Sequence, residues 1–216
     1  SYLKNGFTQA GFFKESVNFD RGYEDPVHSI RRQSEGIYAM LHFLAYEKEN
    51  GRRHPEWEQK MKNMLDILLQ LQHADGSFPR KFHDDFTVVD DSGGSTPSAT
   101  LPLIMGYKYF KDKRYLASAK RTADYLEKVL ISKADYFSST LDANCEDKEA
   151  SLYAATATYY LSLITKGDEH RHYADLARKA AYFALSWYYV WDVPFAQGQM
   201  LGDIGLKTRG WGNVSV

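Results

Sequence analysis

TPSATLPLIMGYKYFKDKRYLASAKRTADYLEKVL, residues 96–130, changes character at its middle. Residues 96–107 contain no Asp, Glu, Lys or Arg. A helix without charge on any face is buried on most of its faces, and a strand of this length would be unusual. Residues 112–130 instead carry many charges and place Tyr115 and Ala119 on one apolar stripe. The sequence therefore predicts a hairpin in which a buried helix is followed by a surface helix.

The same alternation occurs twice more along the chain. The two further pairs of runs, each uncharged and then amphipathic, are 36–46 with 54–72 and 150–165 with 168–189. Trp57, Tyr115 and Tyr173 open the three amphipathic stripes and are spaced 58 residues apart. The stripes expected to be buried are Trp57, Met61, Met64, Leu65 and Leu68; Tyr115, Ala119, Thr122, Ala123, Leu126 and Leu130; and Tyr173, Ala177, Ala180, Ala181 and Ala184. This order indicates a structural repeat of helical hairpins.

We therefore expect an all-α fold of repeated helical hairpins, with about three to four hairpins in this chain. The hairpins could form an open solenoid, or a partial or complete α/α toroid with the uncharged helices inside. The expected division is an N-terminal loop segment at 1–28 and a single domain at 29–216. Its hairpins are expected at about 29–74, 96–131 and 147–191. Tyr38, Tyr159 and Tyr160 are expected to pack between helices.

The connections between hairpins are longer than the turns within them. Those that lead from a surface helix to the next buried helix are 73–95, 132–144 and 192 onward. Long loops in a compact domain are usually functional, and all of these would emerge at one rim of the fold. The first of them also contains Val88 and Val89, which are expected to form a short strand.

The first long connection carries aromatic and charged side chains. Phe78 and Phe82 are candidates for stacking on sugar rings, and Arg80 for binding substrate. Asp90 and Asp91 are candidate catalytic carboxylates, because acids bind hydroxyls or transfer protons. The alternative interpretation is a solvated loop whose acids favour the start of the next helix through its macrodipole.

The second connection supplies Glu146 and Asp147, which we pair with Asp90 or Asp91 as candidate acid and base. Their alternative role is again structural, in the first turn of a helix that Asn144 could cap. The third connection supplies further candidate substrate-binding residues, which are Trp191, Asp192, Arg209 and Trp211. Part of this aromatic group could instead serve helix packing.

Composition excludes several classes of protein. The chain has 216 residues, 27 Lys and Arg against 28 Asp and Glu, and one cysteine. A balanced charge argues against a nucleic-acid partner, and one cysteine excludes an intrachain disulfide framework. No run is long and apolar enough to span a membrane, and His28, His42, His73 and His83 show no tight metal spacing. We expect no cofactor and no metal. The chain shows no targeting signal, which leaves a secreted, periplasmic or cytoplasmic location open.

Three segments resemble those of six-hairpin glycosidases. They are LLQLQHADGSFP at 68–79, DANCEDKEASLYA at 142–154, and WDVPF at 191–195 with TRGWGNVSV at 208–216. The resemblance implies an α/α toroid of about twelve helices that cleaves sugars, or in some relatives isomerises or eliminates them. It implies a bacterial glycoside hydrolase with a carbohydrate substrate and carboxylate acid/base catalysis.

Two other functions stay open at this point. A polysaccharide lyase on the same scaffold would need a base and a cation facing a uronate, for which Arg80, Lys81 and Arg209 are candidates. A non-catalytic glycan- or protein-binding helical domain would need no paired acids. At 58 residues per hairpin the chain is shorter than a ring of six would require. We therefore expect a chain truncated at its C-terminus, a partner chain, or self-association through the open edge of a partial toroid.

Overall fold

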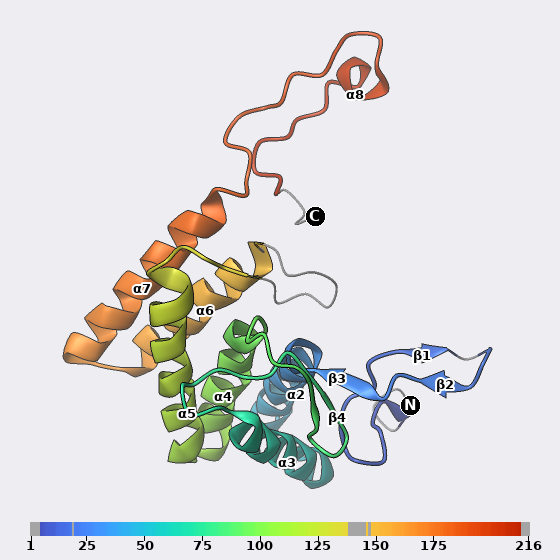
Figure 1. The fold of residues 1–216 in the computed structure, drawn as a ribbon, viewed down its shortest axis with the longest axis vertical. Coiled ribbons are helices and arrows are strands. Elements are labelled where there is room, and N and C mark those ends of the chain that lie inside the picture. The colour runs from blue at the N-terminus through green and yellow to red at the C-terminus, as the bar shows by residue number, and fades with distance from the viewer. Residues whose placement is uncertain (1–4, 19, 138–145, 147, 213–216) are drawn as a thin grey trace.

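The computed structural model describes residues 5–18, 20–137, 146 and 148–212. Three helical hairpins form its main body (Figure 1). The first pairs α2 (Ile30–Glu49) with α3 (Pro55–Leu71). The second pairs α4 (Thr96–Phe110) with α5 (Lys113–Tyr125), which continues into a π-helical turn, η1 (Leu126–Ile131). The third pairs α6 (Lys148–Ile164) with α7 (Gly167–Leu185).

The first helix of each hairpin lies on the inside of the fold. Helix α4 packs against α2 on one side and against α6 on the other. Most of its residues are buried, as its lack of charge predicts. Helices α3, α5 and α7 each pack on the outside of their own inner helix. The prediction of repeated helical hairpins forming part of an α/α toroid is therefore confirmed.

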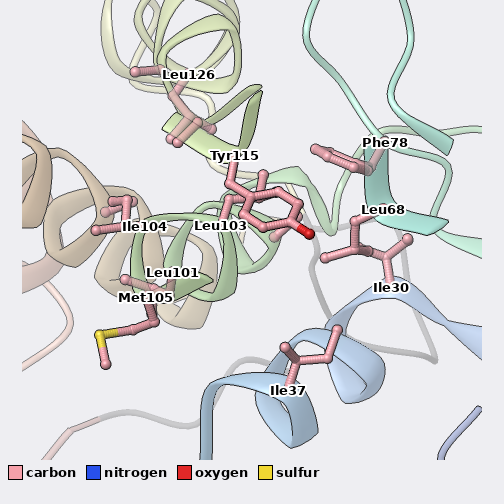
Figure 2. Packing of buried hydrophobic residues seen from close by; sticks show 14 of the residues in the cluster. Ile30, Ile37, Leu68, Phe78, Leu101, Leu103, Ile104, Met105, Tyr115 and Leu126 are labelled. Atoms are coloured by element: carbon pink, nitrogen blue, oxygen red, sulfur yellow. The ribbon is translucent and has the colours of Figure 1, made fainter. Parts of the chain in front are cut away.

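The core lies where the inner helices meet the apolar stripes of the outer ones. Figure 2 shows Ile37 of α2, Leu68 of α3 and Leu103 of α4 around the ring of Tyr115. The predicted stripes are buried in α3 from Met61 onward and throughout α5 and η1. The prediction for Ala181 is wrong, because this residue of α7 lies on a face that no described element covers.

Short strands hold the N-terminal segment and the first long connection against the helices. Strand β3 (Val27–Ser29) pairs with β4 (Lys81–His83), and β4 pairs with β5 (Val88–Asp90), all antiparallel. The strand expected at Val88 and Val89 is thus present as part of β5. Strands β1 (Val17–Asn18) and β2 (Tyr23–Glu24) form a separate ribbon in the segment expected to be a loop.

The start of α2 is fixed by contacts with this N-terminal segment. Ser29 caps the helix, because its Oγ accepts a hydrogen bond from the backbone N–H of Arg32 at 3.2 Å. The buried Glu15 carboxylate accepts a hydrogen bond from the backbone N–H of Ser29 at 2.7 Å. A negative charge at a helix N-terminus also interacts favourably with the helix dipole. These contacts place the first turn of α2, and with it Arg31 and Glu35.

The DGSF turn after α3 attaches the first hairpin to the second. Asp75 accepts hydrogen bonds from the backbone N–H and the Oγ of Ser77, at 3.0 and 2.7 Å. The Gln72 side chain donates to the carbonyl of Ser118 on α5 at 3.1 Å. The Phe78 N–H donates to Thr96 Oγ1 at the start of α4, at 2.9 Å. The DGSF motif, which lies in one of the segments that resemble six-hairpin glycosidases, therefore connects the first hairpin to the second in this chain.

One side of the third hairpin is uncovered. Tyr159 and Leu163 of α6 and Tyr182 and Leu185 of α7 are all exposed. The expectation that Tyr159 packs between helices is wrong, because it is 52% exposed, whereas Leu101, its equivalent 58 residues earlier, is 7% exposed. We call this surface the open face. Beyond α7 the chain forms an arm that projects from the helices, carries the short α8 (Met200–Asp203), and returns (Figure 1).

Within the part of the chain that the structure describes, no helix is long and apolar enough to cross a membrane.

Candidate functional site

Polar side chains from α2 and α6 meet across the inside of the fold. Both helices run in the same direction, since Arg31 reaches Glu149 near their N-termini and Tyr38 reaches Tyr160 further along. The N-termini of the inner helices form the rim to which the long connections lead. We call the group of Arg31, Glu35, Glu149 and Tyr153 at this rim the mouth cluster.

Arg31 holds the two acids of the mouth cluster. Its Nε donates to Glu35 Oε1 at 3.1 Å, and its Nη1 lies 2.6 Å from Glu149 Oε2. The side chains are 22% exposed for Arg31, 43% for Glu35 and 39% for Glu149. Partial burial opposes the charge on Arg31, but the hydrogen bond to Glu35 and the nearby negative charges raise its pKa above the ordinary value. Arg31 therefore stays charged, and the cluster is open to solvent.

Tyr153 completes the cluster. Its hydroxyl donates a hydrogen bond to Glu35, and the Arg31 guanidinium lies 5.9 Å from the centre of its ring. Burial and the hydrogen bond to Glu35 raise the pKa of Tyr153. The phenol therefore stays protonated and serves as a donor.

Further into the fold, a second contact joins the same two helices. The hydroxyls of Tyr38 and Tyr160 lie 3.2 Å apart, and burial together with this hydrogen bond raises the pKa of Tyr38 to about 12. The His42 ring lies edge-on to Tyr38, at 4.5 Å between ring centres. Two half-buried tyrosines and an exposed histidine thus lie below the acids, and the tyrosines offer ring faces and hydroxyl donors.

The acids proposed from the first connection lie at the end of β5. Asp90 Oδ1 accepts the Ser92 N–H at 2.9 Å, and its Oδ2 lies 3.3 Å from Arg80 Nε. Burial alone would raise the pKa of Asp90, but the Ser92 hydrogen bonds and the charge of Arg80 lower it. Asp91 is exposed, with His73 Nε2 at 3.4 Å. The Asp90 carboxylate is thus fixed by Ser92 and Arg80, whereas the Asp91 carboxylate is accessible to solvent.

The other sequence candidates in the first two connections are placed as follows. Glu146 is exposed, and its Oε2 accepts the backbone N–H of Tyr136 at 3.2 Å. Asp147 lies outside the described residues. The rings of Phe78 and Phe82 are fully buried, and Arg80 is buried beside Asp90. Sugar stacking by Phe78 and Phe82 stays a prediction, and it requires the connection to open.

The candidates from the third connection lie in the arm, whose two ends meet where Tyr188 pairs with Gly212. Trp191 and Trp211 are both exposed. Asp192 Oδ1 accepts hydrogen bonds from the backbone N–H groups of Thr208 and Arg209, at 2.9 and 3.0 Å. These bonds join the outgoing and the returning segments of the arm. These hydrogen bonds give Asp192 a structural role, and substrate binding by Asp192, Arg209 and the two tryptophans stays a prediction.

The candidate residues drawn from the sequence do not include Arg31, Glu35, Glu149 or Tyr153. The signal was present as helical spacing, because residues 31, 35 and 38 share one face of α2 and 149 and 153 share one face of α6. Which faces meet depends on how the helices pack. Across residues 5–18, 20–137, 146 and 148–212, no three His, Cys, Asp or Glu side chains are placed together as metal ligands.

No family model matches the chain. Among solved structures it is similar to an unsaturated glucuronyl hydrolase specific for heparin, with a TM-score of 0.64 and 18% identity over 96% of this chain and 61% of that one. It is also similar to a D-mannose isomerase, with a TM-score of 0.63 and 15% identity over 90% and 54% of the two chains. A third similar structure is an unsaturated glucuronyl hydrolase from Streptococcus agalactiae, with a TM-score of 0.59 and 12% identity over 87% and 51%.

These similarities establish the fold. The chain has the architecture of part of an α/α toroid, a scaffold that carbohydrate enzymes use, and it spans between 51% and 61% of the length of these three proteins. At this level of identity the specific reaction does not follow from the likeness.

Proposed function

We propose that this chain belongs to a glycoside hydrolase that acts on an oligo- or polysaccharide at the rim formed by the inner helices. The observation that carries the proposal is the mouth cluster, in which two partly exposed carboxylates from different helices are held by one arginine. Paired carboxylates are the groups that most glycoside hydrolases use. The tyrosines below them offer surfaces on which a sugar ring can stack.

In the proposed reaction, one acid protonates the oxygen of the glycosidic bond while the other acts on the anomeric carbon. The second acid either attacks that carbon directly or activates a water molecule, depending on whether the carboxyls are about 5–5.5 Å or about 6.5–9.5 Å apart. We assign these roles to Glu35 and Glu149. Both carboxylates are held by Arg31 in this structure.

The pair chosen from the sequence is kept as the second assignment. Asp90 or Asp91 would then act with Glu146 or Asp147, from the connections that lead to α4 and α6. Asp91 and Glu146 are exposed, which suits a group that exchanges protons with a substrate. Asp90, held by Arg80 and Ser92, suits the acid that stays ionised.

A substitution series tests both assignments. Glu35→Gln and Glu149→Gln should each lower the turnover of a cleaved glycoside by about 100-fold or more, because general acid–base catalysis contributes on that order. Asp175→Asn, on the outer surface of α7, is the matched control and should leave turnover unchanged. Full activity in Glu35→Gln and Glu149→Gln, with loss in Asp91→Asn or Glu146→Gln, would move the site to the second pair.

The same experiment distinguishes the alternative functions. An unsaturated product that absorbs ultraviolet light would indicate a lyase. Its candidate cation Arg80 is buried and paired with Asp90. Binding of an oligosaccharide without any cleavage would instead indicate a glycan-binding domain.

A further inference from the structure

We infer that the mouth cluster selects sugars without a carboxylate and rejects uronates. The inference rests on the proposed function, since it names the substrate class of the same site. It follows from what the charges of the cluster already do in this structure.

The cation of the mouth cluster is engaged by protein groups. Arg31 presents its Nε to Glu35 and its Nη1 to Glu149, at 3.1 and 2.6 Å. Its guanidinium also lies beside the Tyr153 ring. A uronate carboxylate that bound Arg31 would have to displace one of these acids and leave it without its partner, in a site where two of the three charged side chains are already acidic. Such a displacement is costly because the displaced charge is partly removed from water.

The neighbouring Arg32 places its Nη1 3.4 Å from Oε2 of Glu15, and three further cations on these segments are placed as follows. Lys148 Nζ lies 5.7 Å from the centre of the Tyr188 ring, at the base of the arm. Arg80 is buried and paired with Asp90. Arg209 is on the arm, where its backbone N–H donates to Asp192.

Within the mouth cluster, two acids face one cation. Arg31 offsets one of the two acids in the cluster, and Asp91 and Glu146 add exposed negative charge on the connections that lead to α4 and α6. A like charge placed against a partly buried acid is repelled more strongly than in bulk water. Tyr38, Tyr153 and Tyr160 instead offer hydroxyl groups and ring faces, which suit the hydroxyls and the apolar face of an uncharged sugar.

Matched pairs of ligands test the inference. The probes are 4-nitrophenyl glucoside with 4-nitrophenyl glucuronide and the corresponding galactoside with galacturonide, each as both anomers. Within a pair the two ligands differ only in a hydroxymethyl group against a carboxylate. Binding to the full 216-residue chain is measured by ligand-observed NMR titration, and release of 4-nitrophenol is followed separately.

The neutral member of a binding pair should bind at least about fivefold more tightly at low salt, because like-charge contacts disfavour the wrong partner. The difference should shrink as salt screens the charges. Glu149→Gln removes one of the acids and should narrow the difference, whereas Asp175→Asn on the outside of α7 should leave it unchanged. Thermal unfolding of each variant verifies that it is folded.

Equal or tighter binding of the uronate member would overturn the inference, and so would a preference that Glu149→Gln leaves unaltered. Selective binding of the neutral member without release of 4-nitrophenol would support the inference and count against hydrolysis of these glycosides. Failure of every probe to bind would overturn the inference and contradict a glycan site at the mouth. The two proposals therefore fail in different ways.

Discussion

Gly76 shows how a single residue fixes the joint between two hairpins. Its backbone has a φ of +93°, and a Cβ at this position would lie 2.2 Å from the carbonyl oxygen of Arg121 on α5. Residues other than glycine rarely adopt this backbone conformation. The carbonyl of Arg121 also belongs to a packed helix, so it cannot move away freely. The DGSF motif therefore requires glycine for two separate reasons.

Gly76→Ala should lower the free energy of unfolding by about 2 kcal/mol or more, from backbone strain together with the clash. Gly51→Ala is the matched control, because Gly51 has a φ of +76° but no atom within 4 Å of its added Cβ. It should cost about 1 kcal/mol, from strain alone. Urea unfolding of both variants measures the difference, and equal losses would show that the close approach to Arg121 has no cost.

We predict that Glu47 makes the folded chain less stable in acid. Hydrogen bonds from Arg52 and His54 lower the pKa of Glu47 to about 2. A carboxyl whose pKa is lower in the folded than in the unfolded chain contributes stability above its unfolded pKa, and this is lost as the pH falls through the folded value. Stability should therefore decline between about pH 5 and pH 2. Glu47→Gln should flatten that decline, measured by urea unfolding, whereas the exposed Glu49→Gln should not. An unchanged pH profile in Glu47→Gln would contradict this role.

At the residue scale, sequence predicted the type of side chain better than its exposure. Phe78 and Phe82 were expected at the rim, but their rings are in the core, because β4 and the turn before it fold down onto the helices. Asp91 and Trp191 are exposed, as residues in long connections usually are. Burial depends on contacts between segments that are far apart in sequence, which no local pattern reports.

At the scale of elements, α2 and α6 are joined by side chains across the interior. We expect the Tyr38–Tyr160 contact to couple them. Tyr38→Phe and Tyr160→Phe should each lower the free energy of unfolding by about 1 kcal/mol, as for a typical hydrogen bond. The double variant should cost less than the sum of the two single losses. A double-mutant cycle in urea measures the coupling, and strictly additive losses would mean that the two hydroxyls do not interact.

The helices were predictable from sequence because their cause is local. The uncharged runs predicted α2, α4 and α6. The apolar stripes at helical spacing predicted the buried sides of α3 and α5. The ribbon of β1 and β2 was not predicted, since its strands are only two residues long. The pairing of α2 with α6 through Arg31 was also out of reach, because it depends on the angle at which three helices pack.

At the scale of the whole molecule, the open face stays without a described partner. A groove of about 720 Å³ lies between α6 and α7 and is lined by residues that include Tyr159, Leu163, Ala177 and Ala181. Ser98, Leu101 and Met105, which lie 58 residues before Thr156, Tyr159 and Leu163, are buried. Exposed apolar surfaces of this kind mark interfaces.

We therefore expect the chain to self-associate through this face when it is prepared alone. Leu163→Lys places a charge in the lining of the groove and should shift the chain toward a monomer. Light scattering coupled to size-exclusion chromatography measures the mass. Tyr23→Lys, an exposed position in β2, is the control. A monomeric parent chain, or association that Leu163→Lys does not weaken, would contradict this expectation.

The central claim is that a glycan binds between α2 and α6, and NMR of selectively labelled tyrosine rings tests it most directly. Neutral oligosaccharides and the 4-nitrophenyl glycosides would be titrated into the 216-residue chain. Signals of Tyr38, Tyr153 and Tyr160 should shift with added ligand, while those of Tyr23 and Tyr182 should not. Shifts confined to tyrosines outside the mouth, or no shift with any ligand, would contradict the account.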